Sequence, residues 1–198
     1  MSLYLLKSQM QNWINETSWP KELQTFVQLH GRDPLQISDV DPQISTELVM
    51  QLASLGNNGR QRQSLQAALF LVGNQLDASH HISQNLHSPI GSYLHGIMHR
   101  REGDYGNAKY WFHQAGSFGF FQTISMSISL AERQTLSGPS ASDWAFDPAE
   151  LTDLHRTMAN SQRSQQQSAL REVVTKLAWL ELRAVIDDIL ETSTNASL

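Results

Sequence analysis

The sequence predicts an all-α protein, and three observations support this fold class. Apolar residues recur three or four positions apart through most of the chain, which is the spacing of one face of a helix. Prolines, glycines and capping residues interrupt this pattern at intervals typical of helix ends. Stretches with the alternating pattern of a β-strand are scarce. The 198 residues favour one domain with a hydrophobic core of its own.

Three helices are expected in the first part of the chain. Residues 3–15 carry apolar side chains at helical spacing. Pro20 suits the first turn of a second helix, which a glycine ends. Asp41 followed by Pro42 predicts the start of a third helix, because an N-cap residue precedes a proline at the first helical position. This third helix is expected to end near Gly56.

Further helices are expected through the centre of the chain. Turn residues at 57–60 precede a fourth helix. Ser88 and Pro89 repeat the signal of a cap followed by a proline, and Gly103 with Asp104 marks the break between two later helices. The expected helices run from the turn to about Val72 and then over 76–87, 89–103, 104–116 and 118–132.

Residues 135–146 predict a linker, because Ser, Gly and Pro dominate them. The linker divides a helical body over 1–134, with a central hairpin at 89–116, from a C-terminal helical pair over 147–198. The last helix, about 163–192, carries a long apolar stripe. This stripe is expected to dock on the body or on a second subunit, so a homodimer through the C-terminal helix is one expectation.

The composition excludes several classes of function. The chain has no cysteine, which rules out disulfides, thiolate nucleophiles and zinc–thiolate sites. Its net charge of −5 disfavours nucleic-acid binding driven by bulk charge. Residues 1–7 lack a basic region before a long apolar stretch, and no apolar run reaches about 20 residues, so we expect no signal peptide, no membrane span and a cytoplasmic location. The chain also lacks a G-x-S-x-G elbow and a Walker loop.

Residues 91–116 hold small and large side chains at fixed spacings that allow two antiparallel helices to approach closely. This pattern resembles a tetratricopeptide repeat, with His99 at a position where an aromatic residue is usual. A weaker echo of the pattern precedes it by 30 residues, at Gly73, Ala78 and Ile82. The sequence thus predicts tetratricopeptide-like hairpins within a single helical domain. The residues that match are Gly96, His99, Gly103, Asp104, Tyr105, Ala108, Phe112 and Ala115.

Six of the eight histidines fall between residues 80 and 113. His95 and His99 are four positions apart and therefore share one face of a helix. His80 and Gln84 form a similar pair on the preceding helix, so imidazoles from both helices converge if the two helices pack together.

Four hypotheses stay open for this region. In the first, the histidines are structural, and Arg100, Arg101 and Glu102 form a solvated face. In the second, the region is a pocket for a small anionic or sugar-like ligand, and in the third it is a metal-dependent or acid–base enzyme site. In the fourth, the hairpin is a protein-interaction scaffold. The candidate ligand-binding residues are His80, Gln84, Ser92, Arg101, Asn107 and Lys109. The candidate catalytic residues are His95, His99 and Arg100, and the candidate ligands of a divalent metal are His80, His95 and His99.

Residues 79–84 and 91–112 also resemble an uncharacterised family of bacterial and fungal proteins. The shared pattern is S-H-x-I-S-Q, then G-S-x-x-H-x-I-M-H-R-R-E-x-D, then N-x-K-Y-W-F, and it covers about 35 residues of the chain. Position 94 is Leu where the pattern has Trp. The resemblance supplies no activity. It implies that one constellation comprises His80, Gln84, His95, His99, Arg100, Arg101, Asn107 and Lys109.

Overall fold

A computed structural model describes residues 18–35, 44–160 and 165–191, and all regular elements within these ranges are helical. The all-α prediction is confirmed. The helix expected over 3–15 lies outside the described residues. The described elements are α2 (Lys21–His30), α3 (Thr46–Ala53), α4 (Gly59–Val72), α5 (Leu76–Ser83), α6 (Pro89–Glu102), α7 (Tyr105–Ala115), α8 (Phe120–Met126), α9 (Leu130–Ser137), the 3₁₀ helix η1 (Gly138–Asp143), α10 (Pro148–Asn160) and α11 (Gln165–Glu191).

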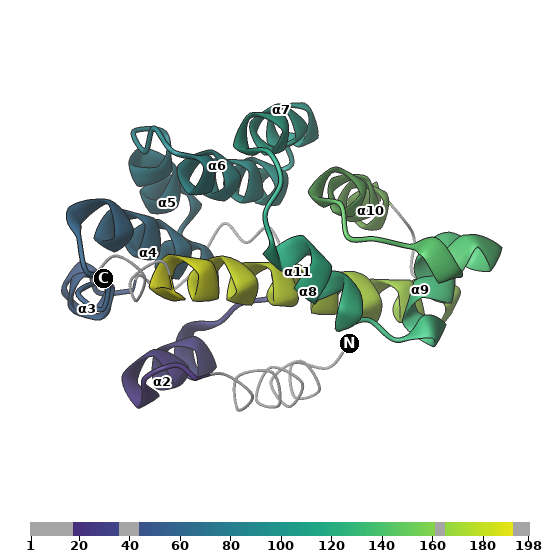
Figure 1. Ribbon diagram of the computed structural model, residues 1–198, viewed down its shortest axis with the longest axis horizontal. Coiled ribbons are helices and arrows are strands. Elements are labelled where there is room, and N and C mark those ends of the chain that lie inside the picture. The colour runs from purple at the N-terminus through teal and green to yellow at the C-terminus, as the bar shows by residue number, and fades with distance from the viewer. Residues whose placement is uncertain (1–17, 36–43, 161–164, 192–198) are drawn as a thin grey trace.

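Helix α11 runs through the middle of the molecule and the other helices pack around it (Figure 1). Its C-terminal half contacts α4, and Leu182, Val185 and Ile186 join the hydrophobic cluster of α2 to α7. Its N-terminal half contacts α8, α9 and α10, and Val174 and Leu177 join the second hydrophobic cluster. The long C-terminal helix is therefore confirmed, with its apolar stripe buried inside this chain. A homodimer through the helix stays a prediction.

The hairpin of α6 and α7 forms where the caps predict it. The Ser88 side chain accepts a hydrogen bond from the Gly91 amide at 3.2 Å, which starts α6. Gly103 ends α6 in the left-handed conformation, at φ 90°. The Asp104 side chain then accepts from the Asn107 amide at 3.1 Å and starts α7. Local chemistry therefore determines both ends of this turn.

Gly96 lets α6 and α7 approach. A Cβ atom added at Gly96 would lie 2.8 Å from two ring carbons of Phe112, closer than real Cβ atoms come to other atoms. The Phe112 ring is buried and occupies the space that a side chain at position 96 would need. Phe112 therefore packs against α6 at Gly96. The likeness to a tetratricopeptide repeat stays a prediction.

One expected helix, over 118–132, is two helices. α8 ends at Met126 and α9 begins at Leu130. Between them, the Ser129 amide donates to the Glu132 carboxylate at 2.8 Å, and the Glu132 amide donates to the Ser129 hydroxyl at 3.3 Å. This reciprocal pair is a capping box, so Ser129 starts a new helix. The S-x-x-E spacing is visible in the sequence.

Two other helix ends differ from the expectation. Ser45 caps α3 by accepting from the Leu48 amide at 3.3 Å, and Ile44 is not helical, so the start predicted at Asp41 is wrong. Asp41 itself lies outside the described residues. Helix α5 ends at Ser83, four residues before the predicted end at His87. Predicted ends drift where several residues can cap a helix equally well.

The expected linker contains structure of its own. Residues 135–146 include the end of α9 and all of η1, and both Ala141 and Phe146 are buried. The division of the chain into a body and a C-terminal pair stays a prediction.

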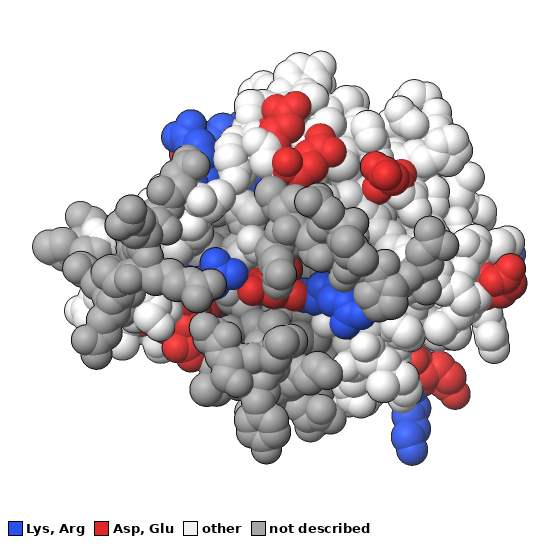
Figure 2. Space-filling model, turned by 180° about the vertical axis from the view of Figure 1, so that it is seen from behind, with Lys and Arg blue, Asp and Glu red and all other residues white. Residues whose placement is uncertain are grey.

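No helix within the described ranges has both the length and the apolar character needed to cross a bilayer. On the face shown in Figure 2, the described acidic and basic side chains lie scattered among uncharged atoms. That distribution fits the small net charge of −5. The expectation that nucleic acid is not a partner stays a prediction.

Candidate functional site

Helix α6 buries nearly all of its length and presents different polar groups on different faces. Its residues 93–101 are all buried. Because successive side chains of an α-helix are rotated by about 100°, His95 and His99 share one face while Arg100 and Arg101 point in other directions. Each face meets a different neighbour, since α6 contacts α4, α5 and α7. The site is best described face by face.

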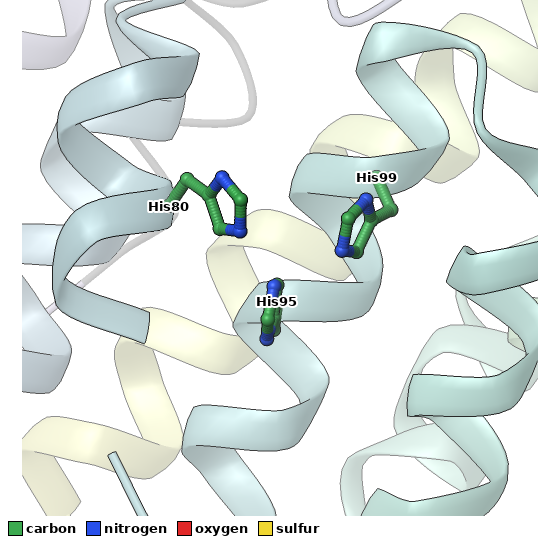
Figure 3. A group of neighbouring side chains, drawn as sticks. All are labelled: His80, His95 and His99. Carbon is green, nitrogen blue, oxygen red and sulfur yellow. The ribbon is translucent and has the colours of Figure 1, made fainter. Parts of the chain in front are cut away.

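The histidine face brings three imidazoles together (Figure 3). His80 extends from α5 toward α6, where His95 and His99 lie one turn apart. The centroid of the His80 ring lies 4.8 Å from that of the His95 ring and 5.4 Å from that of the His99 ring. The His95 and His99 rings are stacked, with centroids 4.6 Å apart. One ring nitrogen from each histidine lies within 4.8 Å of the other two. The predicted convergence is confirmed.

His95 has no hydrogen-bond partner among the described residues for either ring nitrogen, although its side chain is buried. Its ring is covered by the indole of Trp111 from α7, with centroids 4.3 Å apart. Burial, followed by the charges of His99 and His80, lowers the pKa of His95 to about 4. His95 is therefore neutral near pH 7 and keeps a ring nitrogen lone pair available inside the cluster.

His99 is oriented by a carboxylate. Its Nδ1 lies 2.6 Å from Oε1 of Glu102, one turn further along α6. With Nδ1–H donating to Glu102, Nε2 is the ring nitrogen of His99 with a free lone pair. His80 is half-buried, so the cluster has its most exposed member on the α5 side. The three rings thus form a buried group of nitrogen lone pairs with one exposed edge.

Arg100 belongs to the face that meets α11. Its guanidinium donates to both carboxylate oxygens of Glu181, and Nη1 lies 3.2 Å from Oε1. The Tyr93 hydroxyl, two turns earlier on α6, donates to the same carboxylate at 2.8 Å. The Arg100 guanidinium also lies 5.4 Å from the centre of the Phe112 ring. The buried Glu181 carboxylate, which accepts from Arg100 and Tyr93, therefore joins α11 to α6.

Arg101 belongs to the face that meets α4. Its guanidinium donates to the Leu71 carbonyl and, at 2.7 Å, to the side-chain oxygen of Asn74. Arg100 and Arg101 are each 2% exposed, so the hypothesis of a solvated face is wrong for both. Both arginines instead tie α6 to other helices.

The other four candidate residues are outside the three-histidine group. Gln84 is exposed at the end of α5, and Ser92 is half-buried in the first turn of α6. Asn107 is exposed in the first turn of α7, and its side-chain amide donates to Asp104 at 3.3 Å. Lys109 pairs with Asp153 of α10 at 2.6 Å. Asn107 and Lys109 thus engage Asp104 and Asp153 rather than the histidines.

Sequence reasoning missed three contributors. Trp111 of α7 covers the His95 ring. Glu102 orients His99 at the spacing of three that neighbours on a helix share. Glu181 neutralises Arg100. The feature of the sequence that could have pointed to Glu181 is its carboxylate within the apolar run Trp179–Leu182.

Comparisons with known proteins complete the description of the site. The chain matches no protein-family model, no curated protein sequence and no solved structure.

Proposed function

We propose that this protein binds one divalent transition-metal ion, of the Zn²⁺ type, through His80, His95 and His99. The observation that carries the proposal is the pair of unpartnered, buried ring nitrogens of His95 inside a group of three imidazoles. Leaving a buried polar group without a partner costs about 1–3 kcal/mol. A metal ion would offset that cost by accepting a lone pair.

The distances suit an ion after a small closure of the rings. The candidate ligand atoms lie within 4.8 Å of one another. Zinc–nitrogen bonds of about 2.0–2.1 Å in a tetrahedral site separate the nitrogens by about 3.4 Å. Rotation about χ2 of histidine, which has a broad energy well, brings ring nitrogens together at little cost.

The surroundings of the rings also suit a metal. A neutral imidazole is the form that binds a metal, and burial keeps His95 neutral by lowering its pKa. The Glu102 carboxylate on Nδ1 of His99 is the arrangement that orients many zinc-bound histidines. Three protein ligands leave a fourth position for water or a substrate oxygen, as in catalytic rather than structural zinc sites.

A pocket for an anionic or sugar-like ligand receives less support. The candidate ligand-binding cations Arg101 and Lys109 already engage Asn74 and Asp153, and Arg100 is paired with Glu181. A second group of potential metal ligands, His99 with Glu102 and Asp104, shares His99 but draws its carboxylates from exposed residues. The three-histidine group is therefore the stronger candidate.

The test is metal binding by the full chain after treatment with a chelator. We expect Zn²⁺ to bind in a 1:1 ratio and Co²⁺ to give the intense visible bands of a four-coordinate site. His80→Gln, His95→Gln and His99→Gln should each abolish tight binding. His81→Gln is the matched control, because His81 is the exposed neighbour on α5 and outside the group. Binding that persists at full affinity in His95→Gln would refute the proposal.

A further inference from the structure

The proposed metal site offers its ion three uncharged ligands. His80, His95 and His99 each supply an imidazole, and this group of described residues includes no carboxylate. A neutral imidazole leaves the 2+ charge of the ion intact, whereas a carboxylate ligand would cancel part of it. A zinc ion held by three histidines lowers the pKa of a bound water into the neutral range, so that hydroxide is available as a nucleophile. The ligand set therefore suits hydrolysis.

The side of the cluster toward α5 is the one open to solvent. His80 is half-buried, and its neighbour His81 on α5 is exposed. The ring of His95 is instead covered by Trp111 of α7. Because His95 and His99 are both buried, only a small group can approach the fourth position of the ion.

The charges beside the cluster disfavour an anionic substrate. Glu102 and Asp104 are exposed, and the ligand atoms of His99 and these two carboxylates all lie within 4.8 Å of one another. Arg100 and Arg101 are buried on other faces of α6, where they bind Glu181 and Asn74. A carboxylate or phosphate that approached the ion would therefore be repelled by Glu102 and Asp104, whereas an uncharged carbonyl compound would not.

We propose that the metal-loaded site hydrolyses small uncharged carboxylic esters, an inference that rests on the metal site proposed above. The hydroxide on the ion attacks the carbonyl carbon, and the ion stabilises the negative charge that develops on the carbonyl oxygen. The bond from this carbon to the alkoxy oxygen breaks, and the alcohol leaves with the proton of the hydroxide. A new water binds the ion and releases a proton to solvent. One ester and one water thus give a carboxylate, an alcohol and a proton.

Asp104 carries a charge that can be removed without loss of a helix cap. Its side chain starts α7 by accepting from the Asn107 amide at 3.1 Å. Asparagine caps a helix about as well as aspartate does, so Asp104→Asn keeps the cap and removes the charge. Glu22→Gln removes the same charge from an exposed position of α2 and is the matched control.

The test compares an uncharged ester, methyl para-acetoxybenzoate, with an anionic one, para-acetoxybenzoate, on the full chain loaded with Zn²⁺. Release of the phenol from the uncharged ester should be about tenfold or more faster than with His95→Gln at the same Zn²⁺ concentration. A chelator should abolish this difference. Asp104→Asn should raise the rate for the anionic ester relative to the uncharged one by about two- to fivefold at low ionic strength, and Glu22→Gln should leave this ratio unchanged.

A second measurement does not depend on turnover. In the chain loaded with Co²⁺, acetohydroxamic acid should shift the visible bands saturably, because it is a small uncharged carbonyl compound that binds metals and the fourth position is open to it.

Three results would each overturn the proposal while the metal site stands. They are Zn²⁺ binding without faster hydrolysis of the uncharged ester than in His95→Gln, Co²⁺ bands that do not respond to acetohydroxamic acid, and an unchanged ratio of the two ester rates in Asp104→Asn. A full chain that binds no Zn²⁺ would instead refute the metal site, and ester hydrolysis with it.

Discussion

The imidazole of His95 stacks on the indole of Trp111, with ring centroids 4.3 Å apart and planes inclined by 26°. The two residues come from α6 and α7, so this stack holds the histidine cluster against the second helix of the hairpin. It also places an intrinsic fluorophore directly beside the proposed metal ligands.

Trp111 should therefore report on metal binding. Zn²⁺ added to the metal-free chain should change the tryptophan emission, because a bound ion alters the charge and position of the stacked His95 ring. Trp111→Phe should lose this change while it still binds Zn²⁺ in a chelator competition. A change of equal size in Trp111→Phe would show that the ion binds elsewhere.

Glu102→Gln tests whether the carboxylate orients His99. Loss of the carboxylate charge beside Nδ1 of His99 should weaken Zn²⁺ binding by about 10–100-fold, as for other residues that orient metal-bound histidines. Glu172→Gln, at an exposed glutamate of α11, is the control and should leave the affinity unchanged. Affinity is measured by competition with a chromophoric chelator. Equal affinity in both variants would contradict the assigned role.

Gly96→Ala should destabilise the protein. A methyl group there meets the buried Phe112 ring at 2.8 Å, and overpacking of this kind costs about 1–3 kcal/mol. The gain in helix propensity, about 0.5–1 kcal/mol, does not offset it. Gly106→Ala, at an exposed position of α7 where the nearest atom is 3.9 Å away, should instead stabilise slightly. Urea unfolding of both variants measures the difference, and equal signs would contradict the packing argument.

Glu181→Leu should be more destabilising alone than together with Arg100→Met. The single variant leaves the buried Arg100 guanidinium without its carboxylate, and breaking such a pair costs about 3–5 kcal/mol. The double variant removes both charges and leaves only the Tyr93 hydroxyl without its acceptor. Urea unfolding gives the free energy of each variant. A double variant as unstable as the sum of the two single variants would contradict the pairing.

His155 should make the protein less stable as the pH falls. Burial, and after it the charge of Arg100, lowers the pKa of His155 from its ordinary value of 6.5 to about 3. Above pH 6.5 the His155 imidazole is neutral in both the folded and the unfolded chain. Between about pH 6.5 and 3 the imidazole is protonated in the unfolded chain but stays neutral in the folded chain. The folded protein therefore loses stability over this range as the pH falls. The full loss is about 5 kcal/mol at most.

His155→Leu should flatten this dependence in denaturant unfolding measured over that range. His113→Leu, at an exposed histidine of α7, should leave the slope unchanged. Because the pKa of His95 is also lowered, to about 4, a smaller slope of the same sign should persist in His155→Leu. A wild-type stability that rises as the pH falls from 6.5 would contradict the assignment.

Helix positions around the site were predictable because their signals are local. Ser88, Pro89 and Gly103 each act within a few residues of the helix end they define. The shared face of His95 and His99 follows from their spacing of four. The convergence of His80 needed one further assumption, that α5 and α6 pack together, and the structure bears it out.

The sequence by itself determined the helical class, the α6–α7 turn and the histidines that share a face, because caps and helical periodicity depend on neighbours within about four residues. Only the tertiary structure decided that Arg100 turns away from them to Glu181, 81 positions along the chain, and that the starts of α4 and α6 line one pocket. Contacts between distant segments depend on how whole helices pack, and no local pattern encodes which buried charge lies across the core.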